Sequence, residues 1–161
     1  MTISKGDKVP AVDVTLATAD GPQKINSADI FGKGTVALFA VPGAFTPTCS
    51  ARHLPGYVDK AADLKARGVD KIVCVSVNDA FVMKAWGQAQ NALGVVEMVA
   101  DGNGDFTRAL GLELDARGFG MGERSKRFAA IIKDGVVKDL FVEAPGAFDV
   151  SSADYMLSKL T

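Results

Sequence analysis

The chain has 161 residues, a length typical of one domain that buries a core without disulfides or metal ions. Hydrophobic residues make up 48% of it, as in ordinary soluble proteins, and 18 Lys and Arg against 19 Asp and Glu leave a net charge of -1. This balance argues against a nucleic-acid partner, and no apolar stretch reaches membrane-spanning length. Residues 1–7 lack the apolar core of a secretory signal. We therefore expect one cytoplasmic domain over residues 1–161, without nucleic-acid or membrane partners.

The first third of the chain predicts short elements that lead to a buried strand. We expect a strand over 11–16, a turn at 20–21, a short helix over 27–31 and a buried strand over 36–41. The last of these is a short apolar run closed by Pro42-Gly43, which is typical of a strand that ends at a turn.

A helix with a cysteine in its first turn is predicted next. Thr46 suits the N-cap, and Pro47 suits the first helical position because it lacks an N–H that would be unpaired there. Cys49 then lies where free N–H groups and the helix dipole favour an anion, so its thiol is biased toward the nucleophilic thiolate. The alternative is a buried cysteine that packs as a small hydrophobe. Neighbouring Thr and Pro residues favour the reactive interpretation.

This helix is expected to run from residue 48 to about residue 67, with a kink at Pro55. A second buried strand over 72–77 contains the other cysteine, Cys74. It lies about three residues from the end of its strand, so the two thiols should be too far apart for a disulfide, and Cys74 is predicted to be a core residue.

The second half predicts a helix capped by Asn78-Asp79, with a mainly buried stripe made of Phe81, Val82, Ala85, Trp86, Ala89 and Leu93. We then expect a strand over 95–100, a short helix ending at 110, an irregular Gly-rich segment over 112–124 and a hairpin of 128–132 with 136–142. Residues 151–154 are expected to cap a final helix that ends at 160. The order of elements predicts an α/β fold: a thioredoxin-like fold with N-terminal and central additions, in which helices flank a mixed β-sheet.

A helix terminus alone stabilises a thiolate only modestly, so a cation should lie near Cys49. Arg52 follows three residues later on the same helical face. A basic cluster made of Arg124, Lys126 and Arg127 precedes the predicted strand at 128. For each of these residues taken alone, a solvated surface charge is the favoured interpretation, and spacing does not decide which one reaches Cys49.

The only histidine, His53, lies four residues after Cys49, so a Cys–His dyad is one interpretation. A hydrolase would also need an orienting group and a substrate cleft, which no pattern indicates, and local packing or a hydrogen bond is favoured for His53. Residues 49–52 read Cys-Ser-Ala-Arg rather than C-x-x-C, which disfavours a thioredoxin-type disulfide exchanger.

The segment 41–55, VPGAFTPTCSARHLP, resembles the active-site segment of the peroxiredoxins. With the following Gly56-Tyr57 and the segments 75–82 and 124–128, the chain is similar over nearly its whole length to the subfamily of the mammalian fifth peroxiredoxin and the plant type II enzymes. The resemblance implies Pro42, Thr46, Cys49 and Arg127 as active-site residues, and it selects Arg127 as the cation.

The resemblance implies a thiol peroxidase that reduces hydrogen peroxide and organic hydroperoxides through a sulfenic acid on Cys49. It requires no cofactor or metal, and it implies a homodimer with Phe45 and the 78–81 turn as apolar contact candidates. Relatives that resolve the oxidised cysteine within one chain carry a second Cys just before the last helix, where this chain has Phe148-Asp149-Val150-Ser151-Ser152.

Regeneration is therefore expected from an external thiol: glutaredoxin, glutathione or thioredoxin. A general thiol–disulfide oxidoreductase and a non-enzymatic redox sensor are the alternatives to a peroxidase.

Overall fold

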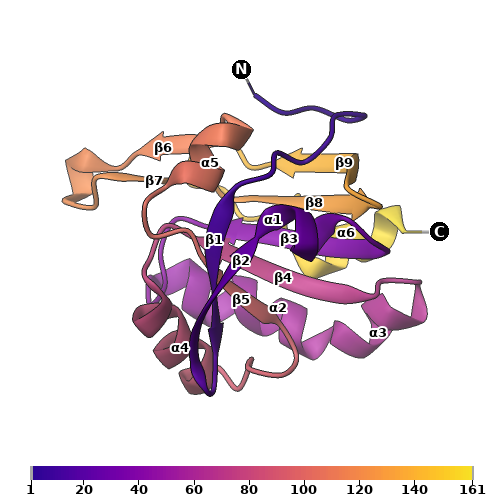
Figure 1. Ribbon diagram of the computed structural model, residues 1–161, viewed down its shortest axis with the longest axis horizontal. Coiled ribbons are helices and arrows are strands. Elements are labelled where there is room, and N and C mark those ends of the chain that lie inside the picture. Colours follow the sequence, from indigo (N-terminus) through magenta and orange to yellow (C-terminus); the bar gives the residue numbers. More distant parts are fainter. Residues whose placement is uncertain (1, 161) are drawn as a thin grey trace.

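A seven-stranded mixed sheet forms the centre of the computed structural model, which describes residues 2–160 (Figure 1). Its strand order is β2-β1-β5-β4-β3-β8-β9. The strands are β1 (Asp13–Thr18), β2 (Gly21–Asn26), β3 (Thr35–Val41), β4 (Lys71–Ser76), β5 (Glu97–Ala100), β8 (Phe128–Lys133) and β9 (Val136–Val142). β3, β4 and β5 are parallel, and the other pairs are antiparallel. This arrangement confirms the predicted α/β class with a mixed sheet.

Helices cover both faces of the sheet, as a parallel centre requires. One face packs against α2 (Leu54–Asp59), α3 (Ala61–Ala66), α4 (Ala80–Ala89) and α6 (Ala153–Lys159). The other packs against α1 (Ser27–Phe31) and α5 (Asp105–Leu110). Figure 1 shows α2, α3 and α4 along one side of the strands. Among residues 2–160, no helix is long and apolar enough to cross a membrane.

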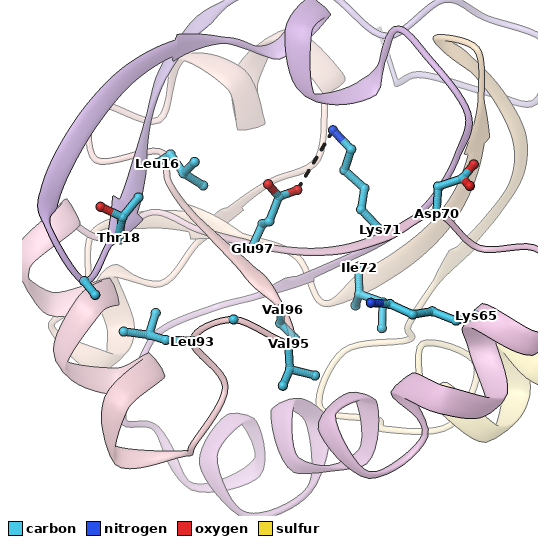
Figure 2. A pocket seen from close by; sticks show the side chains of 13 residues that line it. Leu16, Thr18, Lys65, Asp70, Lys71, Ile72, Leu93, Val95, Val96 and Glu97 are labelled. Carbon is cyan, nitrogen blue, oxygen red and sulfur yellow. Dashed lines mark ion pairs between the residues drawn. The ribbon is translucent and has the colours of Figure 1, made fainter.

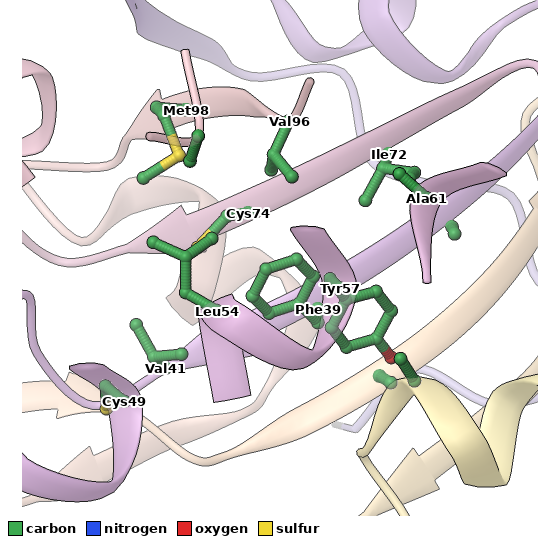
Figure 3. Close-up of a cluster of buried hydrophobic side chains, with 14 of the residues drawn as sticks. Phe39, Val41, Cys49, Leu54, Tyr57, Ala61, Ile72, Cys74, Val96 and Met98 are labelled. Atoms are coloured by element: carbon green, nitrogen blue, oxygen red, sulfur yellow. The ribbon is translucent and has the colours of Figure 1, made fainter. Parts of the chain in front are cut away.

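Aromatic packing anchors the helix after Cys49 to the sheet, as Figure 3 shows. The rings of Phe39 in β3 and Tyr57 in α2 are parallel, with centroids 4.0 Å apart. Leu54, one turn before Tyr57, is also fully buried. Burying side chains of this size contributes about 1.5–3 kcal/mol each, so these residues hold the helix after Cys49 firmly against β3.

The predicted hairpin of β8 and β9 is confirmed. Asp134 and Gly135 between the strands both have positive φ, 50° and 81°, which two-residue hairpin turns require. β8 pairs with β3, opposite Phe39 and its neighbours. The hairpin therefore places the segment before β8, which includes Arg127, beside the carboxyl end of β3.

Outside the helix that carries Cys49, the structure departs from the expected elements in three places. The segment 112–124 is not irregular: β6 (Glu113–Asp115) and β7 (Glu123–Ser125) pair in a small second sheet, with a 3₁₀ turn between them. β2 was not expected as a strand, because its sequence GPQKIN is polar; it is the edge strand of the sheet.

The third concerns α4, whose buried residues are Ala80, Met83, Trp86 and Gly87. Of the predicted stripe, only Trp86 is in this set, and Phe81 is 72% exposed. The buried residues explain the difference: Ala80, Met83 and Trp86 recur at helical spacing and pack on the core, so the neighbouring Phe81 lies off this face.

Candidate active site

The loop after β3 leads directly into the helix that carries Cys49. Pro42 is half-buried and follows the last residue of β3, and Pro47 is the first helical residue, as predicted. Thr46 precedes the helix, but its side chain is not the expected cap: its hydroxyl donates to the Gly43 carbonyl at 2.6 Å. The short span from Gly43 to Thr46 brings that carbonyl within reach, and the hydroxyl proton is already committed to it.

Cys49 lies in a π-helical segment, Cys49–His53, and not in a regular α-helix. The Leu54 N–H donates to the Cys49 carbonyl, five residues back. Pro55 has no N–H to donate to the preceding turn, and the helix accommodates this by widening by one residue. The predicted single helix to residue 67 is also broken at Lys60, where α2 ends and α3 follows.

The Cys49 thiol is fully buried, and one guanidinium contacts it. Arg127, from the segment between β7 and β8, donates from its Nη2 to Cys49 Sγ at 3.0 Å. Arg52 instead lies over the ring of Phe148, 4.6 Å from its centroid. Arg124 donates to the carbonyls of Met121 and Val77. Of these three arginines, Arg127 is the one bonded to the thiol.

His53 is fully buried and bonded at both ring nitrogens. Its Nδ1 lies 2.7 Å from Arg127 Nη1, and its Nε2 lies 3.0 Å from the Ser151 carbonyl. Because a guanidinium only donates and a carbonyl only accepts, Nδ1 must be the acceptor and Nε2 must carry the proton. Burial and the adjacent Arg127 charge lower the pKa of His53 to about 3, against a weaker raising effect of the Ser151 carbonyl.

His53 is therefore a neutral group that orients Arg127, a contact that sequence reasoning missed. The sequence holds one signal for it: a lone histidine one helical turn after the cysteine. Its partner 74 residues away could not be read from spacing. The favoured interpretation of His53 as a hydrogen-bonding residue nevertheless agrees with the structure.

Cys74 lies inside β4, opposite Phe39 in the neighbouring strand, and is also fully buried. Both cysteines are free thiols, and Figure 3 shows them apart, with Leu54 and Val41 between them in this view. Burial, with a smaller contribution from Cys49, raises the pKa of the Cys74 thiol well above its usual value. Cys74 is therefore the core residue that its strand predicts.

A hollow of about 540 Å³ lies away from Cys49, at the amino ends of β4 and β5. Figure 2 shows the Lys71–Glu97 pair inside it, and its lining includes apolar residues such as Ile72 and Val95. Cys49 follows the carboxyl end of β3, which is parallel to β4, so the two places lie at opposite ends of the strands. The hollow contains no cysteine or histidine.

Comparison with known proteins identifies the family. Residues 4–157 match the family model described as Redoxin. Peroxiredoxin-2B of Arabidopsis thaliana is 48% identical, over 98% of this chain and 98% of that protein. The chloroplastic Peroxiredoxin-2E-2 of Oryza sativa subsp. japonica is 51% identical, over 99% of this chain and 73% of that protein.

Among solved structures, that of reduced Prx3 from Vibrio vulnificus in complex with hydrogen peroxide has a TM-score of 0.95 and 53% identity. The alignment covers 99% of this chain and 100% of that one. Together with the mixed sheet and the cysteine in the helix after β3, these similarities confirm the predicted thioredoxin-like fold. The chain belongs to the peroxiredoxin family, within the subfamily of the plant type II enzymes and the mammalian fifth peroxiredoxin, and is a thiol-dependent peroxidase.

Proposed function

We propose that the protein reduces hydrogen peroxide and organic hydroperoxides, with Cys49 as the nucleophile. The observation that carries this proposal is the 3.0 Å hydrogen bond from the half-buried Arg127 to Sγ of the fully buried Cys49. A guanidinium and the start of a helix both favour the thiolate over the thiol. The related Prx3 was crystallised with hydrogen peroxide, which supports the same substrate class here.

In the reaction, Cys49 sulfur attacks the terminal peroxide oxygen, and the O–O bond breaks. Sulfur is oxidised to sulfenic acid, the bond electrons go to the leaving oxygen, and that oxygen leaves as water or alcohol after taking a proton. Arg127 donates hydrogen bonds to the oxygen on which charge develops, which lowers the barrier more than it stabilises the ground state.

Thr46 and Pro42 complete the proposed site. Because the Thr46 hydroxyl proton is held by the Gly43 carbonyl, the hydroxyl oxygen is left to accept a hydrogen bond from the peroxide O–H. This would align the peroxide for attack by Cys49. Pro42 is half-buried between β3 and this loop and would limit the access of water.

An external thiol would regenerate the enzyme. Cys74 is fully buried in β4, and its raised pKa keeps it a neutral thiol, which is a poor nucleophile. Ser151 and Ser152 stand where some relatives carry a resolving cysteine. A glutathione, glutaredoxin or thioredoxin thiol would attack the sulfenic acid, release water and form a mixed disulfide, which a second thiol reduces. The cytoplasmic location stays a prediction from the sequence.

We also propose a homodimer that forms through the loops around the site. Phe45 and Phe81 are 55% and 72% exposed, an unusual exposure for aromatic side chains. The loop that carries Phe45 is joined to the turn that leads into α4, where Phe81 lies, because the Ala44 N–H donates to the Asn78 side chain at 3.0 Å. Sedimentation should therefore give the mass of a dimer for the wild type and of a monomer for Phe81→Glu, with Val142→Glu as a control for an exposed residue elsewhere.

Stopped-flow mixing with limiting peroxide tests the proposed function, followed by intact-mass analysis after thiol trapping. We expect fast loss of one thiol per chain and a mass that corresponds to sulfenic acid on Cys49. A general disulfide oxidoreductase would barely react with peroxide, and a sensor would react slowly. A dominant Cys49–Cys74 disulfide would contradict the proposed external reductant.

A further inference from the structure

The segment after β9, residues 143–152, which we call the C-terminal strap, is folded around one carboxylate. Oε2 of Glu143 accepts hydrogen bonds from the Asp149 N–H, the Ser151 N–H and the Ser151 hydroxyl, at 2.6, 2.8 and 2.7 Å. The Glu143 N–H donates to the Arg127 carbonyl at 3.0 Å. Glu143 thus joins the strap to the backbone of Arg127.

The strap presents its Ser151 carbonyl to the helix that follows Cys49. Ser151 is fully buried, and its carbonyl accepts from two side chains: His53 Nε2 at 3.0 Å and the Tyr57 hydroxyl at 2.8 Å. Phe148, also in the strap, lies edge-on to the His53 ring, with centroids 5.0 Å apart. The strap therefore covers the imidazole and supplies the acceptor for its N–H.

This acceptor decides which nitrogen of His53 is protonated. A neutral imidazole has two tautomers, and only the one with the proton on Nε2 leaves a lone pair on Nδ1 for Arg127. Without the Ser151 carbonyl, the proton could move to Nδ1, where it would face the Arg127 guanidinium and break that contact.

We propose that Glu143 is a positioning residue for the peroxidase reaction, which it affects through Ser151, His53 and Arg127. The carboxylate fixes the strap, the strap fixes the tautomer of His53, and His53 fixes the guanidinium that bonds to Cys49. This inference rests on the proposed function, since it concerns the reactivity of Cys49 toward peroxide. It gives the C-terminal strap a role in the chemistry of this chain although the strap carries no cysteine.

The experiment uses the fact that His53 is the only histidine in the chain. Untagged protein labelled with ¹⁵N-histidine gives a spectrum of one imidazole, in which long-range proton–nitrogen couplings identify the tautomer. We expect the neutral Nε2–H form in the wild type from pH 5 to 8. In Glu143→Ala we expect mixed tautomers and a second-order rate with hydrogen peroxide lower by about tenfold.

Tyr57→Phe is the matched control, because it removes the other hydrogen bond to the same carbonyl without touching Arg127 or Cys49. It should keep the tautomer and at least about half of the rate. If Glu143→Ala does not fold, Glu143→Gln and Ser151→Ala should shift tautomer and rate in the same direction by smaller amounts.

Three outcomes would overturn the proposal: an unchanged tautomer and rate in the folded Glu143 variants, a changed tautomer with an unchanged rate, or an equal loss of rate in Tyr57→Phe. A wild type that does not react with peroxide would refute the proposed function instead. The NMR measurement would still test whether the strap sets the tautomer of His53.

Discussion

The two cysteines of this protein share burial but differ in their polar contacts. Both side chains are fully buried, both are free thiols, and both belong to the same hydrophobic cluster. Cys49 begins a helical segment and accepts a hydrogen bond from Arg127, whereas Cys74 lies within β4 among apolar neighbours. Burial alone therefore does not make a cysteine inert: the hydrogen-bond donors around the sulfur and its position at the start of a helical segment decide its chemistry.

The strongest test of this comparison exchanges each sulfur for oxygen. Cys49→Ser should abolish peroxide reduction and leave the fold intact, because a serine hydroxyl is close in size to the thiol but does not form the nucleophilic anion that a thiolate is. Cys74→Ser should keep most turnover with a glutathione-based reductant. Steady-state peroxide consumption and circular dichroism measure both effects. Turnover that survives in Cys49→Ser would remove Cys49 from its proposed role.

The next test asks which arginine makes Cys49 different. Arg127→Ala should slow oxidation about ten- to a hundredfold, since a lost charge-assisted hydrogen bond is worth about 1.5–3 kcal/mol. Arg52→Ala is the control, because its guanidinium lies over Phe148 and not on the thiol. Stopped-flow rates with limiting peroxide decide between the two. A larger loss in Arg52→Ala would contradict the assignment.

Thr46→Val keeps the side-chain volume and removes the hydroxyl that would accept from the peroxide. We expect about a tenfold loss of rate, against a loss of about 1 kcal/mol in the free energy of unfolding for the bond to Gly43. Denaturant titration gives the second quantity. If stability falls by much more than the activation free energy rises, Thr46 is a structural residue of the loop.

The last test concerns the pH dependence of stability and not the rate of oxidation. Because the pKa of His53 is lowered to about 3, the unfolded chain binds a proton on it below about pH 6.5 while the folded chain does not. Stability should therefore fall with acidification between about pH 6.5 and 3, by at most about 1.4 kcal/mol per pH unit from this group. It should be independent of this group above that range.

His53→Asn offers an acceptor oxygen near the position of Nδ1 but does not titrate. The difference between its denaturation midpoints and those of the wild type should therefore shrink as the pH falls. A constant difference from pH 7 to pH 4 would show that His53 is not held neutral.

Elements that follow from local chemistry could be predicted from the sequence. The sequence predicts the apolar strand before Pro42-Gly43 and the hairpin at Asp134-Gly135. Both depend on turn residues and apolar runs, whose structural effect comes from neighbours a few positions away in the chain. The resemblance to peroxiredoxins located Arg127, and the structure places it on Cys49. Spacing alone left Arg52 equally possible.

The features that the sequence did not predict depend on packing and on contacts between residues far apart in the chain. The π-helical segment arises because Pro55 removes a donor while Leu54 and Tyr57 stay packed on the sheet, and pattern reading predicted only a kink. Phe81 is predicted as core by its spacing, but the face with Ala80, Met83 and Trp86 packs on the sheet and leaves Phe81 exposed. The contact of His53 with Arg127 joins positions 74 residues apart, so no local signal could specify it.

The π-helical segment also has a consequence for where the Cys49 sulfur points. A turn closed by a bond to the fifth preceding residue holds one residue more than an α-turn, and each residue of a helix rotates the next by about 100°. The Cys49 sulfur is thereby offset by about 100° from the direction that an unbroken α-helix continuous with α2 would give it. Tyr57 can therefore stay stacked on Phe39 while the first turn presents the sulfur to the Arg127 guanidinium.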